Sequence, residues 1–381
     1  MNKPLLSIVV PTKNRYVYLY NLIDLIASFK SDDIEMVVQD NSDDNSEFLN
    51  RINLKEYPFI SYFYESKTLS QAGNSDYAVR NSRGEYICFI GDDDGVTKDI
   101  LACCKWMKKN GVECALPERI VYYWPDAYSG SVGNLKTEVF TGKVSEQSTQ
   151  DVLIEVLNRG CIDRGNLPLL YHGIVKKEIL DIIWNKCGTY FPGASPDIAN
   201  GVSLCMIIDK FLKISAPLVI SGISKCAAGG INSLKHHAET DLSKVSQLPS
   251  NISEIWCERI PRIWTNPTIW CESVVEALNA WDRKDLIERL DFEKLYEYFA
   301  AFYGPYKYMA YKLTKNKIKL ITNSCILKFR HYWDALDRRV RRVLHLEHEH
   351  IEVKGLKNIR EVCYYFESKG YKFQDAGDLR A

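Results

Sequence analysis

Three adjacent carboxylates, Asp92, Asp93 and Asp94, follow the apolar run of residues 86–90, with Gly91 between them. Packing does not account for them, because carboxylates this close repel one another and raise one another's pKa unless a cation lies among them. Oxygen ligands of this kind suit Mg²⁺ or Mn²⁺, which usually bind through one or two carboxylates plus substrate phosphates. The residues alone leave an ordinary turn open as the alternative, since Asp-Gly is a turn signal and Asp is common just before a helix.

A fourth carboxylate, Asp197, stands at the start of an expected helix over residues 198–212, directly after Ser195 and Pro196. A helix N-terminus favours the ionised form of a carboxylate, so Asp197 is a candidate to accept a proton as general base. Ser, Pro and an acidic residue in this order are also typical of any helix start. Both interpretations stay open on the residues alone.

The elements that must position Asp92 and its neighbours alternate between strand and helix patterns. Apolar β-branched runs predict buried parallel strands, and apolar residues at helical spacing predict amphipathic helices. The expected strands cover residues 5–10, 34–38, 59–64 and 86–90, and the expected helices cover residues 19–29, 71–81 and 99–109, with Gly111 as a stop signal. This alternation predicts a doubly wound α/β domain, in which the carboxyl ends of the strands meet at one crevice.

The second half of the chain is less regular. Residues 114–124 and 217–221 have strand patterns, and residues 125–143 are rich in loop signals. From about residue 242 the composition shifts to Trp, Tyr, Leu, Lys and Arg at helical spacing, which predicts a helical appendage that extends to the end of the chain.

Composition excludes several classes of protein. The chain has 381 residues, 46% hydrophobic residues and a formal net charge of +0, so charge does not favour a nucleic-acid binder. Its 12 cysteines form no CxxC pair, which is typical of reduced thiols in a cytoplasmic protein. No apolar run approaches the ~18 residues of a membrane span.

Residues 300–343 depart from this balance, with eleven Lys and Arg residues, only two acidic residues and interleaved Tyr and Trp. Basic helices that carry aromatic residues are typical of elements that lie on a membrane surface. The alternative is a basic face that packs on the acidic remainder of the protein or on a second subunit, so a homo-oligomer stays open. No nucleic-acid recognition motif accompanies the charge.

Three segments together resemble family 2 glycosyltransferases, which are inverting, nucleotide-sugar-dependent enzymes of the GT-A fold. They are Leu-Leu-Ser-Ile-Val-Val-Pro-Thr-Lys-Asn-Arg at residues 5–15, Val-Val-Gln-Asp-Asn-Ser-Asp-Asp at residues 37–44 and Arg-Gly-Glu-Tyr-Ile-Cys-Phe-Ile-Gly-Asp-Asp-Asp at residues 83–94. The resemblance covers about the first 110 residues and continues more loosely to residue 237. It implies a GT-A domain over residues 1–241, with a nucleotide-binding half to residue 112 and an acceptor half over residues 113–241, followed by a helical region over residues 242–381.

The resemblance also implies roles for individual residues. Asp40 would accept a hydrogen bond from the base, and the full set of nucleotide or donor contacts would be Pro11, Thr12, Asn14, Arg15, Asp40, Asn74, Asp92 and Asp93. The metal ligands would be Asp94 in the leading role, with Asp92, His236 and His237. His172 and Gly173 would belong to the acceptor loop, and Asp197 matches the catalytic base. Gly91 replaces the first aspartate of the usual Asp-x-Asp-Asp, which leaves the identity of the metal-binding aspartate open.

The predicted function is therefore that of a hexosyl- or hexosaminyl-type glycosyltransferase. It would move a sugar from a UDP-sugar to a hydroxyl of a glycan or lipid-linked glycan during the synthesis of a bacterial surface polysaccharide such as O-antigen or capsule, with Mn²⁺ or Mg²⁺. Its location would be cytoplasmic, with a peripheral position at the inner face of the plasma membrane left open. The alternatives are a non-catalytic nucleotide-sugar-binding scaffold subunit and a sugar nucleotidyltransferase, although the latter would carry a Gly-rich phosphate loop that residues 11–15 do not provide.

Overall fold

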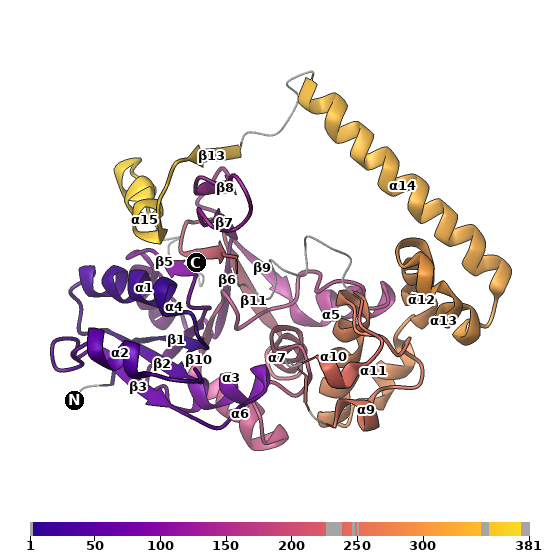
Figure 1. Ribbon diagram of the computed structural model, residues 1–381, viewed down its shortest axis with the longest axis horizontal. Coiled ribbons are helices and arrows are strands. Elements are labelled where there is room, and N and C mark those ends of the chain that lie inside the picture. Colours follow the sequence, from indigo (N-terminus) through magenta and orange to yellow (C-terminus); the bar gives the residue numbers. More distant parts are fainter. Residues whose placement is uncertain (1–2, 226–237, 246–247, 250, 344–349, 375–381) are drawn as a thin grey trace.

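The structure, a computed structural model, describes residues 3–225, 238–245, 248–249, 251–343 and 350–374 (Figure 1). Its main sheet has eight strands in the order β3-β2-β1-β4-β10-β6-β11-β9. These strands are β1 (Leu6–Thr12), β2 (Ile34–Asp40), β3 (Ile60–Tyr64), β4 (Tyr86–Phe89), β6 (Cys114–Pro117), β9 (Val144–Ser148), β10 (Ile174–Lys176) and β11 (Lys210–Ile214). Strands β1 to β4 are parallel, whereas β10 is antiparallel to both of its neighbours.

The first half of the chain confirms the predicted doubly wound α/β arrangement. Its helices are α1 (Tyr16–Ser28), α2 (Ser46–Arg51), α3 (Gln71–Arg80) and α4 (Ile100–Asn110), which ends at Gly111 in the left-handed conformation. Successive residues of a strand point to opposite faces of the sheet. Val9 and Val37 therefore join one core together with α3, while Val10 and Val38 join a second core together with α1 and α4. Burial on both faces explains why these strands have uninterrupted apolar sequences.

A second sheet of five strands, in the order β13-β8-β7-β12-β5, lies beside the first. Its strands are β5 (Gly95–Val96), β7 (Ile120–Tyr123), β8 (Asn134–Glu138), β12 (Val219–Ile223) and β13 (His350–Lys354). The single strand predicted over residues 114–124 is thus two strands, β6 and β7, in different sheets. The predicted loop region of residues 125–143 contains β8.

Three helices lie between the strands of the second half, namely α5 (Thr149–Asn158), α6 (Lys177–Cys187) and α7 (Pro196–Cys205). The helix predicted over residues 198–212 is wrong beyond Cys205, because residues 210–214 form β11. This strand pairs with β6 on one side and β9 on the other. Pairing along both edges outweighs the helical spacing of the apolar residues.

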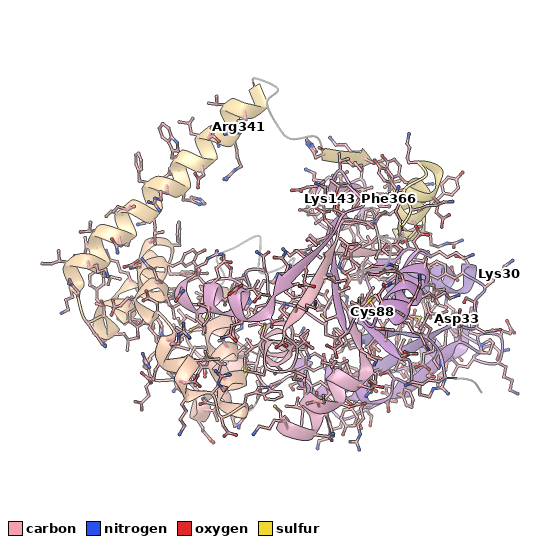
Figure 2. All side chains as sticks on the ribbon, turned by 180° about the vertical axis from the view of Figure 1, so that it is seen from behind. Lys30, Asp33, Cys88, Lys143, Arg341 and Phe366 are labelled. Carbon is pink, nitrogen blue, oxygen red and sulfur yellow. The ribbon has the colours of Figure 1, made fainter. Side chains whose placement is uncertain are left out.

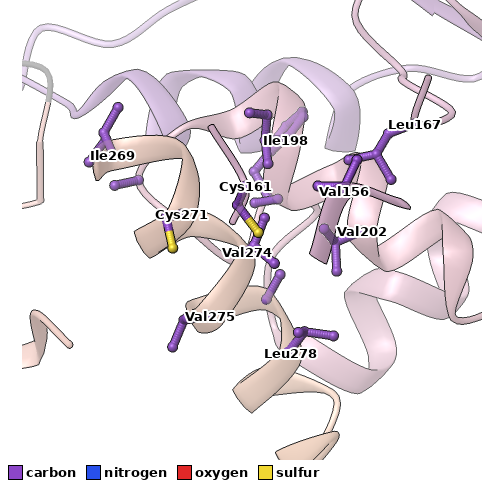
Figure 3. Packing of buried hydrophobic residues seen from close by; sticks show 14 of the residues in the cluster. Val156, Cys161, Leu167, Ile198, Val202, Ile269, Cys271, Val274, Val275 and Leu278 are labelled. Carbon is purple, nitrogen blue, oxygen red and sulfur yellow. The ribbon is translucent and has the colours of Figure 1, made fainter. Parts of the chain in front are cut away.

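The predicted helical region is present after residue 252. It contains α9 (Ile252–Ile255), α10 (Asn266–Ala280), α11 (Lys284–Arg289), α12 (Phe292–Phe302), α13 (Lys307–Leu313) and α14 (Lys317–Val343), with a short 3-10 turn at Gly304–Tyr306. A further 3-10 turn at Leu242–Lys244 precedes it. Figure 3 shows Ile269 and Val274 of α10 beside Ile198 and Val202 of α7. The four side chains belong to the same core as Val9 of β1, so these helices share a core with the α/β body.

The end of the chain differs from the prediction, because residues 350–374 return to the α/β body. Strand β13 pairs antiparallel with β8, and α15 (Ile359–Ser368) packs against α1 (Figure 1). Ile359, Val362 and Phe366 are buried in the core that α1 and α4 share; Phe366 is labelled in Figure 2. The continuous helical appendage therefore ends at Val343.

A buried carboxylate on α10, Glu272, links the stability of this region to pH. Both of its oxygens accept from the backbone N–H of Cys257, at 3.0 and 3.1 Å. Burial raises the pKa of Glu272 to about 8, from an ordinary 4.5. The folded protein therefore keeps this proton between about pH 4.5 and 8, while the unfolded chain loses it, and stability falls as pH rises across that window.

Replacing Glu272 with Gln is expected to remove this fall. The variant and the wild type should have similar free energies of unfolding near pH 5, and the variant should gain up to about 1.4 kcal/mol per pH unit above that. Denaturant unfolding at a series of pH values measures the difference. Glu254→Gln, on the exposed side of α9, is the control and should follow the wild type. A constant difference between Glu272→Gln and the wild type from pH 5 to 8 would contradict the assigned pKa.

Candidate active site

Asp92 and Asp93 lie at the carboxyl end of β4, beside the loop that follows β1. Both are almost fully buried, with exposed fractions of 2% and 4%. Thr12 donates a hydrogen bond from Oγ1 to Asp92 Oδ2 at 2.6 Å. Nη2 of Arg15 lies 3.1 Å from Asp92 Oδ1 and 2.7 Å from Asp93 Oδ2. A guanidinium thus bridges the first two carboxylates, in the place where the sequence predicts a cation.

The protonation of this cluster reflects burial opposed by Arg15. Burial raises the pKa of Asp92 to about 7, although the Arg15 charge opposes the rise. Burial and the charge of Asp94 raise the pKa of Asp93. Burial alone would lower the pKa of Arg15, but the charges of Asp92 and Asp93 outweigh it and the pKa is raised. One arginine therefore balances two buried carboxylates only in part, and the site favours a further positive charge.

Asp94 is arranged differently from its two neighbours. Its Oδ2 accepts from the Gly91 N–H at 2.7 Å, the Tyr171 hydroxyl at 3.0 Å and His172 Nε2 at 2.7 Å, and its Oδ1 accepts from the Gly222 N–H at 2.7 Å. Burial favours the neutral form, but the His172 charge and the hydrogen bonds outweigh it and lower the pKa of Asp94. A carboxylate has about four acceptor positions. Oδ2 thus accepts three hydrogen bonds and Oδ1 accepts one, which leaves Oδ1 as the oxygen of Asp94 that a cation could contact. The leading metal role expected for Asp94 stays a prediction.

Two glycines allow the backbone to approach this closely. A Cβ on Gly222 of β12 would lie 1.8 Å from the Asp93 carbonyl oxygen, and a Cβ on Gly173 would lie 1.9 Å from the Leu169 carbonyl oxygen. Any side chain at either position would displace the backbone. His172 and Gly173, which the resemblance assigns to the acceptor loop, therefore hold that loop against Asp94.

Two residues that the sequence did not single out complete the surroundings of Asp93. Ser224 donates from Oγ to Asp93 Oδ2 at 2.6 Å and accepts from Arg15 Nη2 at 2.8 Å. Trp124 donates from Nε1 to the Asp93 carbonyl at 2.9 Å. Ser224 lies 131 positions after Asp93, and no local sequence pattern around either residue predicts the contact.

Hydrogen bonds join the loop that follows β1 to the loop that follows β2. Asn14 has a φ of 58°, which Asn tolerates, and its side chain exchanges hydrogen bonds with Asp43. Asp40 is fully buried, and its Oδ2 accepts from the Tyr16 hydroxyl at 2.6 Å and the Tyr62 hydroxyl at 2.7 Å. Its Oδ1 accepts from the Ser42 N–H at 2.8 Å. Both oxygens thus have partners within the protein, and a contact between Asp40 and a base stays a prediction. Pro11 lies at the end of β1, one position before Thr12.

Asp197 lies at the N-terminus of α7 and is half-buried, and Ser195 donates from Oγ to its Oδ1 at 2.8 Å. Burial raises the pKa of Tyr171, and the charges of Asp94 and Asp197 contribute to the rise. Tyr171, which donates to Asp94, is therefore within electrostatic reach of Asp197 as well. Arg164 is a further residue near Asp197 that the sequence did not single out. Burial lowers the pKa of Arg164, and the charge of Asp197 opposes this.

Three buried atoms in the predicted donor residues lack hydrogen-bond partners. They are Arg15 Nε, Asn74 Oδ1 and Asp92 Oδ1. Of these, Asp92 Oδ1 still has an ion-pair contact, at 3.1 Å from Arg15 Nη2. A buried polar atom without a partner costs about 1–3 kcal/mol, so the donor Arg15 Nε and the acceptor Asn74 Oδ1 indicate a place for a polar ligand. Elsewhere in the described ranges, such side-chain atoms occur on Asn134, Thr137 and Asn200.

The fit to a divalent cation rests on the carboxylates of Asp92 and Asp93. The described ranges contain no group of three or more His, Cys, Asp or Glu side chains that could hold a metal ion, and His236 and His237 lie outside those ranges. Mg²⁺, however, usually binds through one or two carboxylates plus substrate phosphates. Asp92 and Asp93, whose charges Arg15 balances only in part, fit an ion that a diphosphate would help to bind.

A doubly wound sheet with acidic side chains at the carboxyl ends of its strands defines an α/β protein that binds its ligand at that edge. Residues 7–153 match the family model described as Glycosyl transferase family 2. This part of the chain is thus a family 2 glycosyltransferase domain, as the three motifs predict.

Individual relatives match at low identity. GalNAc(5)-diNAcBac-PP-undecaprenol beta-1,3-glucosyltransferase from Campylobacter jejuni is 28% identical over 149 residues, which are 39% of this chain and 45% of that protein. The chain thus spans less than half the length of this curated relative. Among solved structures, S. aureus TarS 1–349 with UDP-GlcNAc has a TM-score of 0.49 at 14% identity, covering 86% of this chain and 92% of that one. Mannosyltransferase PcManGT from Pyrobaculum calidifontis, in complex with GDP-Man and Mn²⁺, has a TM-score of 0.39 at 16% identity, covering 86% and 88%.

Proposed function

We propose that the protein is an inverting glycosyltransferase that moves a sugar from a UDP-sugar to a hydroxyl of a glycan or lipid-linked glycan. The observation that carries the proposal is the pair of buried atoms without a polar partner, Arg15 Nε and Asn74 Oδ1, together with the two buried carboxylates that Arg15 balances only in part. The family resemblance assigns these residues to the donor. The family 2 domain over residues 7–153 supports the reaction class.

In this proposal the donor diphosphate lies against Arg15, whose Nε is free to donate to a phosphate oxygen. Bidentate contacts of this kind suit arginine and phosphate. Asp92 and Asp93 would hold Mg²⁺ or Mn²⁺, which would stabilise the negative charge of the leaving diphosphate. Asp94 would not contact the donor, but would hold Tyr171, His172 and the β12 backbone in place around it.

Asp197 would act as the general base. The acceptor oxygen bonds to the anomeric carbon as the bond from that carbon to the phosphate oxygen breaks, UDP leaves, and the hydroxyl proton passes to Asp197. Oδ1 of Asp197 accepts from the Ser195 hydroxyl, so Oδ2 is the oxygen that would take the proton.

The relative in Campylobacter jejuni supports a proposal for the acceptor class, because its name specifies an oligosaccharide linked to undecaprenol through a diphosphate. We propose a similar lipid-linked or surface-polysaccharide acceptor for this chain, used on the cytoplasmic side of the membrane. All cysteines in the described ranges are free thiols, which suits a reducing compartment.

Replacing Arg15 with Ala is expected to weaken UDP binding by about 10- to 150-fold, because a hydrogen bond to a charged group contributes about 1.5–3 kcal/mol. Arg15→Lys keeps the charge but not the fork of donors, and should lie between Arg15→Ala and the wild type. Isothermal titration calorimetry with UDP, in the presence of Mg²⁺ or Mn²⁺, measures the change. Lys13→Ala alters an exposed residue of the same loop and is the matched control.

Unchanged UDP affinity in Arg15→Ala would overturn the donor assignment, provided that thermal unfolding shows the variant to be folded. Turnover is tested separately, by UDP release from a panel of UDP-sugars with lipid-linked and free glycan acceptors. UDP binding without release for every donor and acceptor would favour the scaffold subunit instead.

A further inference from the structure

Helix α14 carries a stripe of large apolar side chains on its solvent side. Six of them are 46–79% exposed, namely Ile318, Ile321, Phe329, Tyr332, Trp333 and Leu336. Steps of three, four and eight positions place these residues on one face of a helix. Such a contiguous row of exposed aromatic and aliphatic side chains is unusual on a protein surface and indicates a contact that the isolated chain does not make.

The other side of α14 packs on the body of the protein. Leu320 and Ser324 are buried, and Asn323 donates a hydrogen bond to Glu297 of α12. Leu320 marks the side of α14 that is buried against the body. Ile318 and Ile321 are rotated from it by about 200° and 100° around the helix axis, so the stripe faces away from α12. Figure 1 shows α14 along one edge of the molecule, with its first half beside α12 and α13 and its second half extending away from them.

Basic side chains border the stripe on both sides. Lys317, Lys328 and Arg339 lie along one border, and Lys319 and Arg330 lie along the other. Asp334 and Asp337 are the acidic residues of α14, and Asp337 pairs with Arg341, which Figure 2 labels near the end of the helix. The helix is therefore strongly basic in a chain with a net charge of +0.

We propose that α14 lies in the surface of an anionic phospholipid bilayer, with the apolar stripe inserted among the lipids and the basic borders at the lipid phosphates. Apolar and basic faces in this arrangement are typical of interfacial helices, and Trp and Tyr favour the headgroup region. The helix lies on the bilayer and does not span it, because no helix in the described ranges is both long and apolar enough to cross one. A second copy is a poorer occupant, because its basic borders would face those of the first.

Both ends of α14 are tied to the body, which gives this contact a mechanical consequence. Its start packs on α12, and the chain beyond it returns as β13 and α15. Ile359 of α15 lies against Gly95, the residue that follows Asp94, with 3.3 Å between Ile359 Cβ and the position of a Cβ on Gly95. Binding through α14 would thus hold the site in a fixed orientation to the bilayer, which suits a lipid-linked acceptor. This consequence rests on the proposed function, whereas the membrane contact does not.

Sedimentation of the full chain with vesicles tests the proposal. The chain should bind vesicles that contain phosphatidylglycerol and phosphatidylcholine, and bind phosphatidylcholine vesicles far less. Phe329→Ala combined with Trp333→Ala should lower partitioning to the anionic vesicles by about tenfold or more, because two aromatic side chains no longer leave water. Tyr364→Ala removes an aromatic residue that is 71% exposed on α15, and this control should bind like the wild type.

Equal vesicle binding by the double variant and the wild type would overturn the proposal, as would the absence of binding by the wild type. Sedimentation velocity without lipid tests the competing occupant, since a dimer that the double variant abolishes would assign the stripe to a second copy. UDP binding in solution should be the same in the double variant and the wild type. Vesicle binding needs no turnover, so failure of the membrane contact and failure of the proposed reaction are distinguishable.

Discussion

Replacing Asp197 with Asn is expected to lower the turnover rate by about 10²- to 10⁴-fold, the usual contribution of a positioned general base. The amide cannot accept the acceptor proton at neutral pH. Its oxygen can still accept the hydrogen bond that Ser195 makes to Oδ1, so the start of α7 should keep its conformation. UDP affinity should be unchanged, because the residues proposed to contact the donor lie at the carboxyl ends of strands and not on α7. Single-turnover UDP release and calorimetry on the same preparation separate the two effects.

A matched control for Asp197→Asn exists on α5. Asp151 occupies the first turn of that helix, as Asp197 does on α7, and is exposed. Asp151→Asn therefore makes the same change at a helix start and should keep full activity. Full activity in Asp197→Asn would exclude Asp197 as the base, whereas a parallel loss of UDP affinity would indicate that the change disturbs the site as a whole.

The first half of the fold can be predicted from the sequence, because each of its elements has a clear local pattern of apolar and polar residues. Each parallel strand is buried on both faces and is followed by an amphipathic helix, so strand, helix and crossover appear in order. The same regularity places Thr12, Arg15 and Asp92 at neighbouring strand ends, where the structure joins them. The rule that parallel strands end at the same edge predicts that these strand ends meet at one crevice, and the family resemblance supplied the individual residues.

The remaining parts of the site depend on pairings that no local pattern specifies. Gly222 and Ser224 approach Asp93 and Asp94 from a strand more than a hundred positions later. Strand β13 does show alternation in His-Ile-Glu-Val-Lys, but its partner β8 lies far upstream, and the surrounding helical composition favoured helix. Residues 210–214 have helical spacing and are a strand because β6 and β9 pair with them.

Asp94 is the position where the sequence alone was least informative, since a run of three aspartates gives each the same apparent chemistry. Only the folded structure separates them. Asp94 accepts four hydrogen bonds, whereas Asp93 accepts from Arg15 and Ser224, and Asp92 contacts Thr12 and Arg15. The two neighbours Asp93 and Asp94 should therefore respond in opposite ways to the same substitution.

Asp94→Asn is expected to destabilise the protein by about 3–5 kcal/mol, because one amide group must face donors that now lack an acceptor in a buried place. Asp93→Asn should leave stability equal or higher, since Arg15 and Ser224 keep an oxygen acceptor and the repulsion that raises the pKa of Asp93 disappears. Its activity should nevertheless fall by about 10²-fold or more, because charge at the leaving diphosphate is no longer balanced through this carboxylate.

Denaturant unfolding and UDP release on both variants test this division, and each variant is the control for the other because the chemical change is identical. Similar losses of stability in both would show that the three aspartates act as one structural unit. Full stability in Asp94→Asn would show that its four hydrogen bonds do not anchor the β12 backbone and the loop of Tyr171 and His172, and would favour the metal role predicted for Asp94. A stable, inactive Asp93→Asn beside an unstable Asp94→Asn would place the donor chemistry on Asp92 and Asp93, next to Arg15.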